Sequence, residues 1–292
     1  MTRDPHFGHV SSASIHPVRP LHDVGEQAEA IPLPGFRNVV SDTNGSAPAR
    51  SPAQPTVSLV IPAKNEARNL ATVLGHVPPR VGEVILVDGN STDVTKIMAV
   101  SCRPDIRIVS QDEQGKGHAL RAGFAAARGD IIVAMDADGS MAPSEIPNFV
   151  YFLEHGFDFV KGSRFIGGGG SLDLTAVRRM GNRALLAVAN TLYRTTFTDL
   201  CYGYFAFYRK YLNHLDLMSS GFEIETELTI RAVRAGLRIA EIPSMEMPRR
   251  HGQSSLRSFP DGARVLRTLM RERSSVAPHR DQRPPTPGSH DR

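Results

Sequence analysis

Hydrophobic residues in the central part of the chain gather into short runs separated by polar turns. Four runs rich in Val, Ile and Leu are typical of buried β-strands, at residues 57–61, 84–87, 106–109 and 131–135. Between them, apolar residues recur at helical spacing, near residues 65–74, 94–100 and 119–127. Strands that alternate with helices predict βαβ units. We therefore expect an α/β fold with a mostly parallel central sheet and helices on both faces.

This pattern also suggests where the folded domain begins and ends. Residues 1–55 are rich in Pro, Ser, Ala and His and show no sustained periodicity, so we predict a disordered N-terminal extension. We expect one α/β domain over 56–256, a basic amphipathic helix over 257–273 and a disordered tail over 274–292. The chain of 292 residues is 40% hydrophobic, which is enough for one substantial core.

Composition excludes several classes of protein. The 34 Lys and Arg residues against 30 Asp and Glu give a net charge of +4, too mild to predict a nucleic-acid partner. The only two cysteines, Cys102 and Cys201, imply no disulfide framework. We find no signal peptide in residues 1–55 and no apolar run approaching the roughly 20 residues that span a bilayer. The expected location is the cytoplasm, with peripheral contact at the inner face of the membrane as an option.

Two carboxylates one residue apart, Asp136 and Asp138, follow the fourth predicted strand. Open α/β sheets bind ligands beyond the carboxyl ends of their strands, so both side chains are expected in the ligand crevice. Together they can hold Mg²⁺ or Mn²⁺, which completes its shell with water and substrate phosphates. The alternative is a solvated turn that caps a helix. The position directly after a buried strand favours the metal site.

Two weaker clusters follow other predicted strands. Asp88 ends the second strand, where its carboxylate can accept hydrogen bonds from a nucleobase or ribose. Asp93 is expected to be mainly structural, and Ser91, Thr92 or Asp93 could cap the next helix. In Gly115-Lys116-Gly117, the glycines would let the backbone approach a phosphate while the Lys116 ammonium supplies charge. A flexible turn is the alternative for that segment, which matches neither the dinucleotide fingerprint nor a Walker loop.

Taken together, the motifs resemble glycosyltransferase family 2, and most closely its dolichol-phosphate (polyprenyl-phosphate) mannosyltransferase-like branch. The resemblance covers residues 57–256 and implies a single GT-A, Rossmann-like domain. Nine segments carry it, in this order: Ile61-Pro62-Ala63-Lys64-Asn65-Glu66, 87–93 (Val-Asp-Gly-Asn-Ser-Thr-Asp), Gly115-Lys116-Gly117, Asp136-Ala137-Asp138-Gly139-Ser140, Lys161-Gly162-Ser163-Arg164-Phe165, 198–204 (Thr-Asp-Leu-Cys-Tyr-Gly-Tyr), 221–227 (Gly-Phe-Glu-Ile-Glu-Thr-Glu), Glu241-Ile242-Pro243 and 249–254 (Arg-Arg-His-Gly-Gln-Ser).

The resemblance assigns a role to each matching position. It implies a base and ribose pocket lined by Pro62, Ala63 and Glu66, with Asp88 reading the nucleobase. Lys116 joins the donor-binding residues.

The same resemblance makes Asp136 and Asp138 the metal and diphosphate residues. It also implies that Arg164 and Arg249 bind phosphate, because forked guanidinium donors suit phosphate oxygens. Surface salt bridges are the alternative for both arginines. Ser140 stands where related mannosyltransferases often have Gln, and Ser255 where a Lys is frequent, which leaves one metal ligand and one acceptor contact in doubt.

The implied reaction is displacement at the anomeric carbon with inversion. Metal and arginines would stabilise the departing nucleoside diphosphate. A phosphate acceptor needs no general base because it is already nucleophilic at neutral pH. A sugar hydroxyl would need one, and Asp199, Glu223 and Glu225 are the candidates, although the two glutamates also suit the first turn of a helix.

Three segments bear on the acceptor. Residues 176–193 and 262–273 read as basic amphipathic helices that could lie on an anionic membrane, or could simply cover the sheet. The glycine run 167–170 is typical of a mobile loop over the site or of a plain flexible linker.

The leading hypothesis is transfer of a hexose from a GDP- or UDP-hexose to polyprenyl phosphate. The first alternative is a soluble glycosyltransferase acting on a hydroxyl of a glycan or small metabolite. A sugar-1-phosphate nucleotidyltransferase is disfavoured because Pro62 to Glu66 replace the glycine- and arginine-rich loop expected after its first strand. The alternative of another class is a non-catalytic nucleotide-sugar-binding protein, against which the intact Asp136 and Asp138 pair argues.

Overall fold

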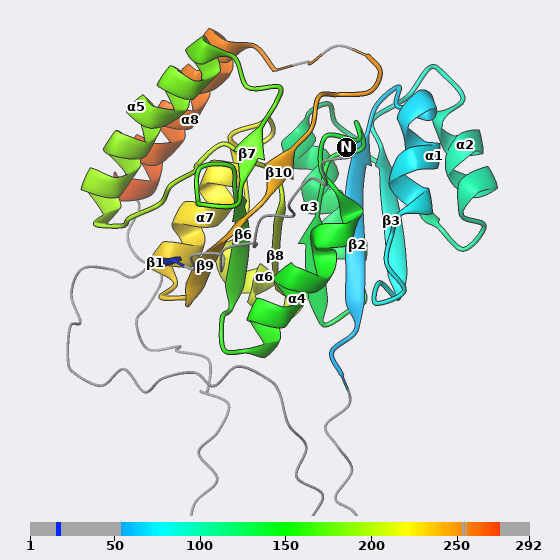
Figure 1. The fold of residues 1–292 in the computed structure, drawn as a ribbon, viewed down its shortest axis with the longest axis horizontal. Coiled ribbons are helices and arrows are strands. Elements are labelled where there is room, and N and C mark those ends of the chain that lie inside the picture. The colour runs from blue at the N-terminus through cyan, green and yellow to red at the C-terminus, as the bar shows by residue number, and fades with distance from the viewer. Residues whose placement is uncertain (1–15, 19–53, 253, 255, 275–292) are drawn as a thin grey trace, which may run out of the picture.

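The computed structural model describes residues 16–18, 54–252, 254 and 256–274. Within them, eight strands form the central sheet in the order β1-β9-β6-β8-β5-β2-β3-β4 (Figure 1). The pairings make every strand parallel except β8 and β1. The strands are β1 (His16–Val18), β2 (Val57–Ala63), β3 (Glu83–Asp88), β4 (Arg107–Ser110), β5 (Ile131–Ala134), β6 (Phe159–Ser163), β8 (Phe205–Tyr208) and β9 (Ile239–Pro243).

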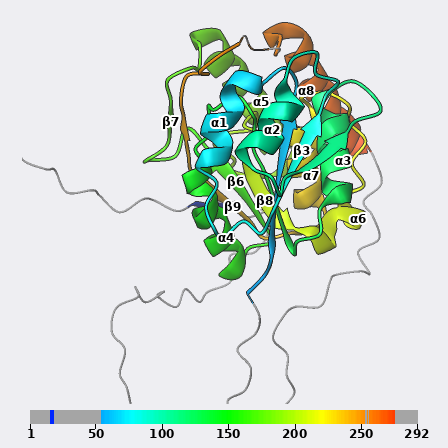
Figure 2. The same ribbon diagram turned by 90° about the vertical axis from the view of Figure 1, so that its right-hand side faces the viewer.

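Helices cover both faces of this sheet, as the sequence predicts. Side chains alternate along β2, so that Leu59 and Ile61 join one core and Val60 the other. The first core packs under α1, α2 and α4, and Figure 2 shows α1 and α2 toward the viewer. The second packs under α3, α5, α7 and α8. The helices are α1 (Ala67–Gly75), α2 (Thr95–Cys102), α3 (Lys116–Ala126), α4 (Ile146–Glu154), α5 (Ala176–Tyr193), α6 (Leu212–Leu215), α7 (Ile224–Arg234) and α8 (Ser258–Ser274).

Two expected boundaries are wrong for physical reasons. The first strand does not stop at Pro62, because β2 continues to Ala63 and pairs Pro62 with Val87 of β3. The ladder between β2 and β5 ends at Val60, so the proline nitrogen, which cannot donate, lies beyond it. Helix α3 begins at Lys116, three residues before the expected position, and this places the lysine on the first turn of a helix.

The ends of the chain are only partly described. Residues 16–18, within the extension predicted to be disordered, pair as β1 with β9. Residues 1–15 and 19–53 of the predicted extension lie outside the described residues. So do residues 275–292 of the predicted tail. Gly170 of the glycine run forms β7 (Gly170–Ser171), which pairs with β10 (Met245–Glu246). No helix in the described part of the chain is long and apolar enough to cross a membrane.

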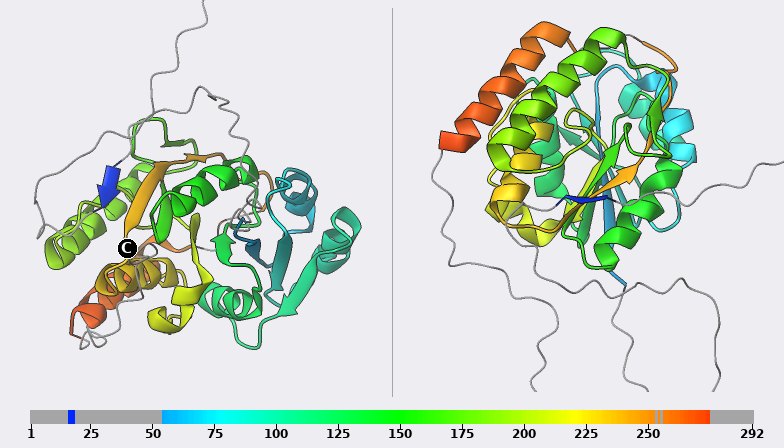
Figure 3. Two further views of the ribbon diagram at one scale, coloured as in Figure 1. Left: turned by 90° about the horizontal axis from the view of Figure 1, so that it is seen from below. Right: turned by 60° about the vertical axis from the view of Figure 1, so that its left-hand side comes forward.

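Helices α5 and α8 lie side by side at one end of the sheet, as the right-hand view of Figure 3 shows. The expected helix over 176–193 is confirmed as α5, and the Thr175 hydroxyl accepts a hydrogen bond from the Arg178 amide to cap its first turn. Helix α8 is held against α7 by Glu272, which is buried and pairs with Arg231 and Arg234. These contacts fix one wall of the cavity described next.

Candidate active site

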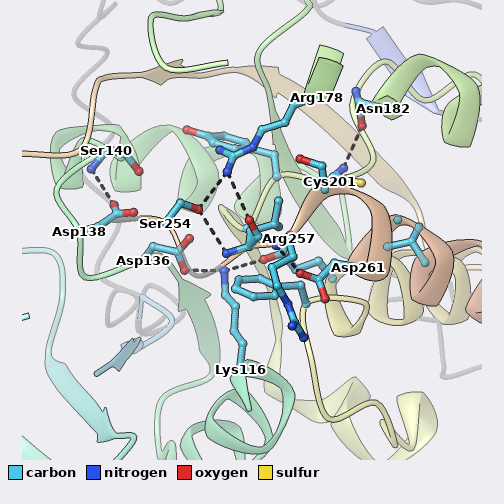
Figure 4. A pocket seen from close by; sticks show the side chains of 18 of the residues that line it. Lys116, Asp136, Asp138, Ser140, Arg178, Asn182, Cys201, Ser254, Arg257 and Asp261 are labelled. Atoms are coloured by element: carbon cyan, nitrogen blue, oxygen red, sulfur yellow. Dashed lines mark hydrogen bonds and ion pairs between the residues drawn. The ribbon is translucent and has the colours of Figure 1, made fainter. Parts of the chain in front are cut away.

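A cavity of about 1120 Å³ opens at the carboxyl edge of the parallel strands and continues between α5 and α8. One end is polar and is formed by the segments that follow β2 and β5 together with the first turn of α3. The other end is lined mainly by apolar side chains of the two helices. Figure 4 shows Asp136, Asp138 and Lys116 at the polar end and Arg178 and Asn182 toward α5.

Lys116 bridges two carboxylates at the polar end. Its Nζ lies 2.5 Å from Oδ1 of Asp136, at the end of β5, and 2.6 Å from Oε1 of Glu225, on the first turn of α7. Burial alone would lower the pKa of Lys116, but the charges of Asp136 and Glu225 outweigh it and raise that pKa. Desolvation, with the neighbouring charges of Asp138 and Glu225, raises the pKa of Asp136 to about 6 although Lys116 opposes it.

The glycines on either side of Lys116 have a steric purpose that the sequence did not reveal. Gly115 has a φ of +128°, and a Cβ on Gly115 or Gly117 would lie 2.2 Å from the carbonyl oxygen of Ser220 or Ser219, respectively. The Gly117 amide donates to the Ser220 carbonyl at 2.8 Å. The two glycines therefore let the backbone that precedes α7 pack closely against the start of α3. This packing brings Glu225 to Lys116.

Gly203 leaves the space that the Lys116–Glu225 pair fills. A Cβ at this position would lie 2.5 Å from Oε1 of Glu225 and 2.8 Å from Nζ of Lys116, both ends of flexible side chains. Gly203→Ala should therefore move the pair and lower turnover by about tenfold, because a small misplacement of charged groups in a site is costly, while thermal unfolding changes little. Gly75→Ala, where a Cβ meets nothing within 4 Å, is the matched control. Equal turnover in the two variants would contradict the prediction.

Arg249 bridges a second pair of carboxylates. Its Nη2 lies 2.8 Å from Oδ2 of Asp138, and its Nη1 lies 3.1 Å from Oε1 of Glu66. Oδ1 of Asp138 accepts a hydrogen bond from the Ser140 amide at 2.9 Å. Pro62, Ala63 and Glu66 line the same cavity, so the structure brings together most of the residues predicted for the donor.

The charges at this end suit a divalent cation. Four carboxylates, those of Asp136, Asp138, Glu66 and Glu225, face only two cationic side chains, an excess of two negative charges. Carboxylate oxygens are the ligands that Mg²⁺ and Mn²⁺ prefer, with substrate phosphates completing the shell. Across the described residues, no group of three or more His, Cys, Asp or Glu side chains is arranged to hold a metal. Two of these carboxylates, completed by substrate oxygens, would suffice to hold such an ion.

Arg164 reaches the cavity but is held by two acids. Its Nε and Nη2 donate to both oxygens of Asp199 at 2.7 and 3.0 Å, and its Nη1 pairs with Glu246 at 3.1 Å. The Asp199 carboxylate is fully buried and does not line the cavity. Its contacts orient Arg164, which does not suit the general base suggested from the sequence. Of the other two candidate bases, Glu225 lines the cavity and Glu223 does not.

The two aspartates of the second motif have different surroundings. Asp88 is 1% exposed, and its carboxylate accepts the Ser91 amide at 3.3 Å. The neighbouring Gly89 lines the cavity, whereas Asp88 does not. Its reading of a nucleobase stays a proposal. Asp93 accepts hydrogen bonds from the amides of Ala67 and Thr95 at the starts of α1 and α2, which is the structural role expected for it.

Several lining residues were not predicted from the sequence. Gln111 lies beside Gly89, and Glu246 pairs with Arg164 across 82 positions of the chain. In the wall of the cavity, Asn182 Nδ2 and Thr226 Oγ1 are buried without a hydrogen-bond partner. Arg178, which the sequence marks only as part of a basic helix, lines the cavity and donates to Ser254 Oγ at 3.2 Å (Figure 4). No local motif marks these residues, because only tertiary packing brings them to the cavity.

Comparison with known proteins identifies the family. The model of Glycosyl transferase family 2 matches residues 58–215, more than half of the chain, and includes the Asp136 and Asp138 pair. The chain belongs to glycosyltransferase family 2. This family membership confirms the resemblance drawn from the motifs, and with it the GT-A fold and an enzyme that transfers glycosyl groups.

Relatives of this glycosyltransferase include two lipid-phosphate enzymes. A polyprenol monophosphomannose synthase of Mycolicibacterium smegmatis is 31% identical over 70% of this chain and 82% of its own length. An undecaprenyl-phosphate mannosyltransferase of Micrococcus luteus is 32% identical over 68% and 87%. Among solved structures, glucosyl-3-phosphoglycerate synthase from Mycobacterium tuberculosis, in complex with Mn²⁺, UDP and glucosyl-3-phosphoglycerate, is 30% identical with a TM-score of 0.62, covering 75% of this chain and 80% of that one.

Proposed function

We propose that this glycosyltransferase transfers a hexose from a nucleotide sugar to a polyprenyl phosphate, with inversion at the anomeric carbon and with Mg²⁺ or Mn²⁺. The observation that carries the proposal is the single cavity that joins a carboxylate-rich end to an apolar groove between α5 and α8. A donor with a diphosphate suits the first end. An acceptor with a phosphate head and a hydrocarbon tail suits the second.

At the donor end, Asp136 and Asp138 would hold the metal, which would supply Lewis-acid stabilisation of the nucleoside diphosphate leaving group. Pro62, Ala63 and Glu66 would line the base and ribose pocket together with Gly89 and Gln111. Asp88, which directly precedes Gly89, would read the nucleobase. Lys116 and Arg249 line the cavity with cationic groups that can contact the diphosphate, and Arg164 lines the same cavity. The solved relative with Mn²⁺ and UDP supports this assignment. Whether the donor carries guanine or uracil is decided by the experiment below.

At the acceptor end, polar groups lie at the border between the two halves of the cavity. Arg178 points into it from α5, one turn before Asn182, whose buried Nδ2 lacks a partner. A guanidinium and an amide donor four residues apart on one helix face can bind a single phosphate. An ionised phosphate needs no general base, so Glu225 is free to hold Lys116.

The tail of such an acceptor would run along the apolar groove toward exposed side chains. Val177, Met180 and Phe259 are 51%, 68% and 83% exposed at the ends of α5 and α8 that border the cavity. Arginines 179, 183, 264 and 267 lie on the same two helices. This mixture is typical of helices that contact an anionic membrane surface, and we propose peripheral contact there, with the enzyme acting from the cytoplasmic face.

A second candidate acceptor is a small phosphorylated metabolite. The glucosyl-3-phosphoglycerate synthase structures, one of them with UDP-glucose and phosphoglyceric acid, support it. The phosphate contacts at Arg178 and Asn182 would suit this acceptor equally well. A small metabolite would leave the apolar groove beyond these contacts unfilled, which is why we prefer the lipid phosphate.

Release of nucleoside diphosphate tests the proposal directly. The full chain is incubated with Mn²⁺ or Mg²⁺ and a panel of UDP- and GDP-hexoses, with and without a short-chain polyprenyl phosphate. Release that the lipid phosphate stimulates would support the leading function and name the donor. Stimulation by phosphoglycerate alone would move the function to the second candidate. No metal-dependent release with any donor would overturn both and favour a non-catalytic binding protein.

Arg178→Met should raise the KM for the phosphate acceptor by roughly tenfold or more, because a charge-assisted contact to phosphate is lost. The slow release of diphosphate without acceptor should stay close to that of the unmodified protein. Arg128→Met is the matched control, because Arg128 is exposed, lies away from α5 and α8 and does not line the cavity. An unchanged KM in Arg178→Met would contradict the acceptor assignment.

A further inference from the structure

We infer that Lys116 and Arg249 are resident counter-ions of the Asp136 and Asp138 pair, which a divalent cation displaces toward the donor diphosphate. The inference rests on the proposed metal site. It links the binding of metal to the binding of nucleotide, because the protein holds its own positive charges where the metal charge would be. Metal and nucleotide should then bind cooperatively rather than independently.

The arrangement of charges is the same around both aspartates. The Nζ of Lys116 lies 2.5 Å from Oδ1 of Asp136, and the Nη2 of Arg249 lies 2.8 Å from Oδ2 of Asp138. Each cation is also held by one acid outside the pair, Lys116 by Glu225 and Arg249 by Glu66. Each aspartate thus shares a bridging cation with one supporting glutamate, and the two bridges come from different parts of the chain.

Burial makes these internal cations necessary. The side chains of Lys116 and Arg249 are 11% and 21% exposed. Those of the four carboxylates are mostly buried as well: 8% exposed for Glu225, 9% for Asp138, 15% for Glu66 and 28% for Asp136. Water therefore screens the carboxylates poorly, and an unpaired carboxylate there would be costly. Without a metal, the two side-chain cations lower the repulsion between the aspartates. A divalent cation entering alone must compete with them, and its binding is weakened accordingly.

The supporting acids explain why the cations stay near the site once they are displaced. A metal on the aspartates removes most of their attraction for Lys116 and Arg249. Glu225 and Glu66 still hold the two cations at the wall of the cavity, where both line the donor end. The donor diphosphate then offers them new anionic partners. Nucleotide therefore favours the metal-bound arrangement, which is a positive coupling between the two ligands.

The backbone around Arg249 is anchored on both sides, so the exchange needs only side-chain movement. The Met247 amide donates to the Ser140 carbonyl at 2.8 Å, and Asn69 Nδ2 donates to the His251 carbonyl at 3.2 Å. Lys116 is likewise fixed on the first turn of α3, with a flexible side chain beyond it. Both cations can turn from carboxylate to phosphate without a change in the fold.

Opposite changes in two affinities test the inference. In Lys116→Met and in Arg249→Met, the Kd of Mn²⁺ for the nucleotide-free protein should fall, on the order of tenfold, because the competing cation is gone. In the same variants, the Kd of UDP or GDP at saturating Mn²⁺ should rise by a similar factor, because a phosphate contact is lost. Titration of free Mn²⁺ by electron paramagnetic resonance gives the first value, and calorimetry gives the second.

Lys210→Met and Arg128→Met are the matched controls, since each removes one exposed positive charge that does not line the cavity, and neither affinity should change. If both affinities weaken together in the site variants, the residues are structural and the inference is wrong, while the metal site stands. If the unmodified protein binds no Mn²⁺ even with nucleotide, the proposed metal site falls and the inference with it. Thermal unfolding of each variant shows that the fold is kept.

Discussion

Asp138→Asn should reduce metal-dependent turnover by more than about tenfold while thermal unfolding stays close to that of the unmodified protein. The two oxygens of Asp138 explain both halves of this expectation. Oδ1 accepts the Ser140 amide, a contact that the asparagine oxygen can keep. Oδ2 faces Arg249 and, in the proposed function, the metal. The substitution removes one negative charge from the site and leaves the turn after β5 intact.

Diphosphate release measured across a range of Mn²⁺ concentrations checks this prediction. Asp105→Asn is the control, because that carboxylate is 66% exposed, pairs with Arg103 and does not line the cavity. The control should behave as the unmodified protein. Near-normal rates in Asp138→Asn, with the metal still required, would show that the metal is held elsewhere.

The second large effect concerns stability rather than chemistry. Asp199→Ala should lower the free energy of unfolding by about 3–5 kcal/mol, because it leaves the buried Arg164 guanidinium without its main partner. Asp199 is fully buried and engages Arg164 through both carboxylate oxygens. Glu246 remains as a partner, but it contacts only Nη1. A true general base would instead lose activity with little change in stability.

Urea unfolding separates these outcomes. Glu154→Ala is the comparison, because its pair with Arg80 is at the surface and should contribute only about 0–1 kcal/mol. Adding Arg164→Met to Asp199→Ala should recover part of the loss, since no unpaired charge then remains in the interior. Equal effects of Asp199→Ala and Glu154→Ala would contradict a structural role for Asp199.

The sequence predicted best what is decided locally. The strands β2, β3 and β5 and the helix α5 were recognisable because apolar periodicity and turn residues lie within each segment. Asp136 and Asp138 lie at the carboxyl edge of the sheet and line the cavity, as expected for residues that follow a buried parallel strand. Their metal remains a proposal. The ends of β2 and α3 were misplaced because pairing with β3, and packing of the Ser219–Ser220 backbone, override local signals.

Contacts between distant segments could not be predicted in this way. Asp199 was offered as a base because nothing near it in the sequence shows that Arg164 will occupy both of its oxygens. Arg249 meets Glu66 across 183 positions, which no spacing rule anticipates. Asn182 lies in an ordinary amphipathic helix, and only its unpartnered amide in the folded cavity distinguishes it. Charge partners and orphaned polar atoms are properties of the packed structure.

The reversed direction of β8 decides which of its neighbours in sequence meets the ligand. Since β8 is antiparallel to β5 and β6, residues that precede it reach the edge where those strands end, and Cys201 to Gly203 line the cavity there. The residues that follow it emerge at the opposite edge, where the Arg209 amide bonds to the carbonyl of Asp130. An insertion after Tyr208 would therefore lengthen the chain far from the chemistry, whereas one before Phe205 would rebuild the site. Variation in substrate specificity is therefore expected in the segment before β8 rather than in the one after it.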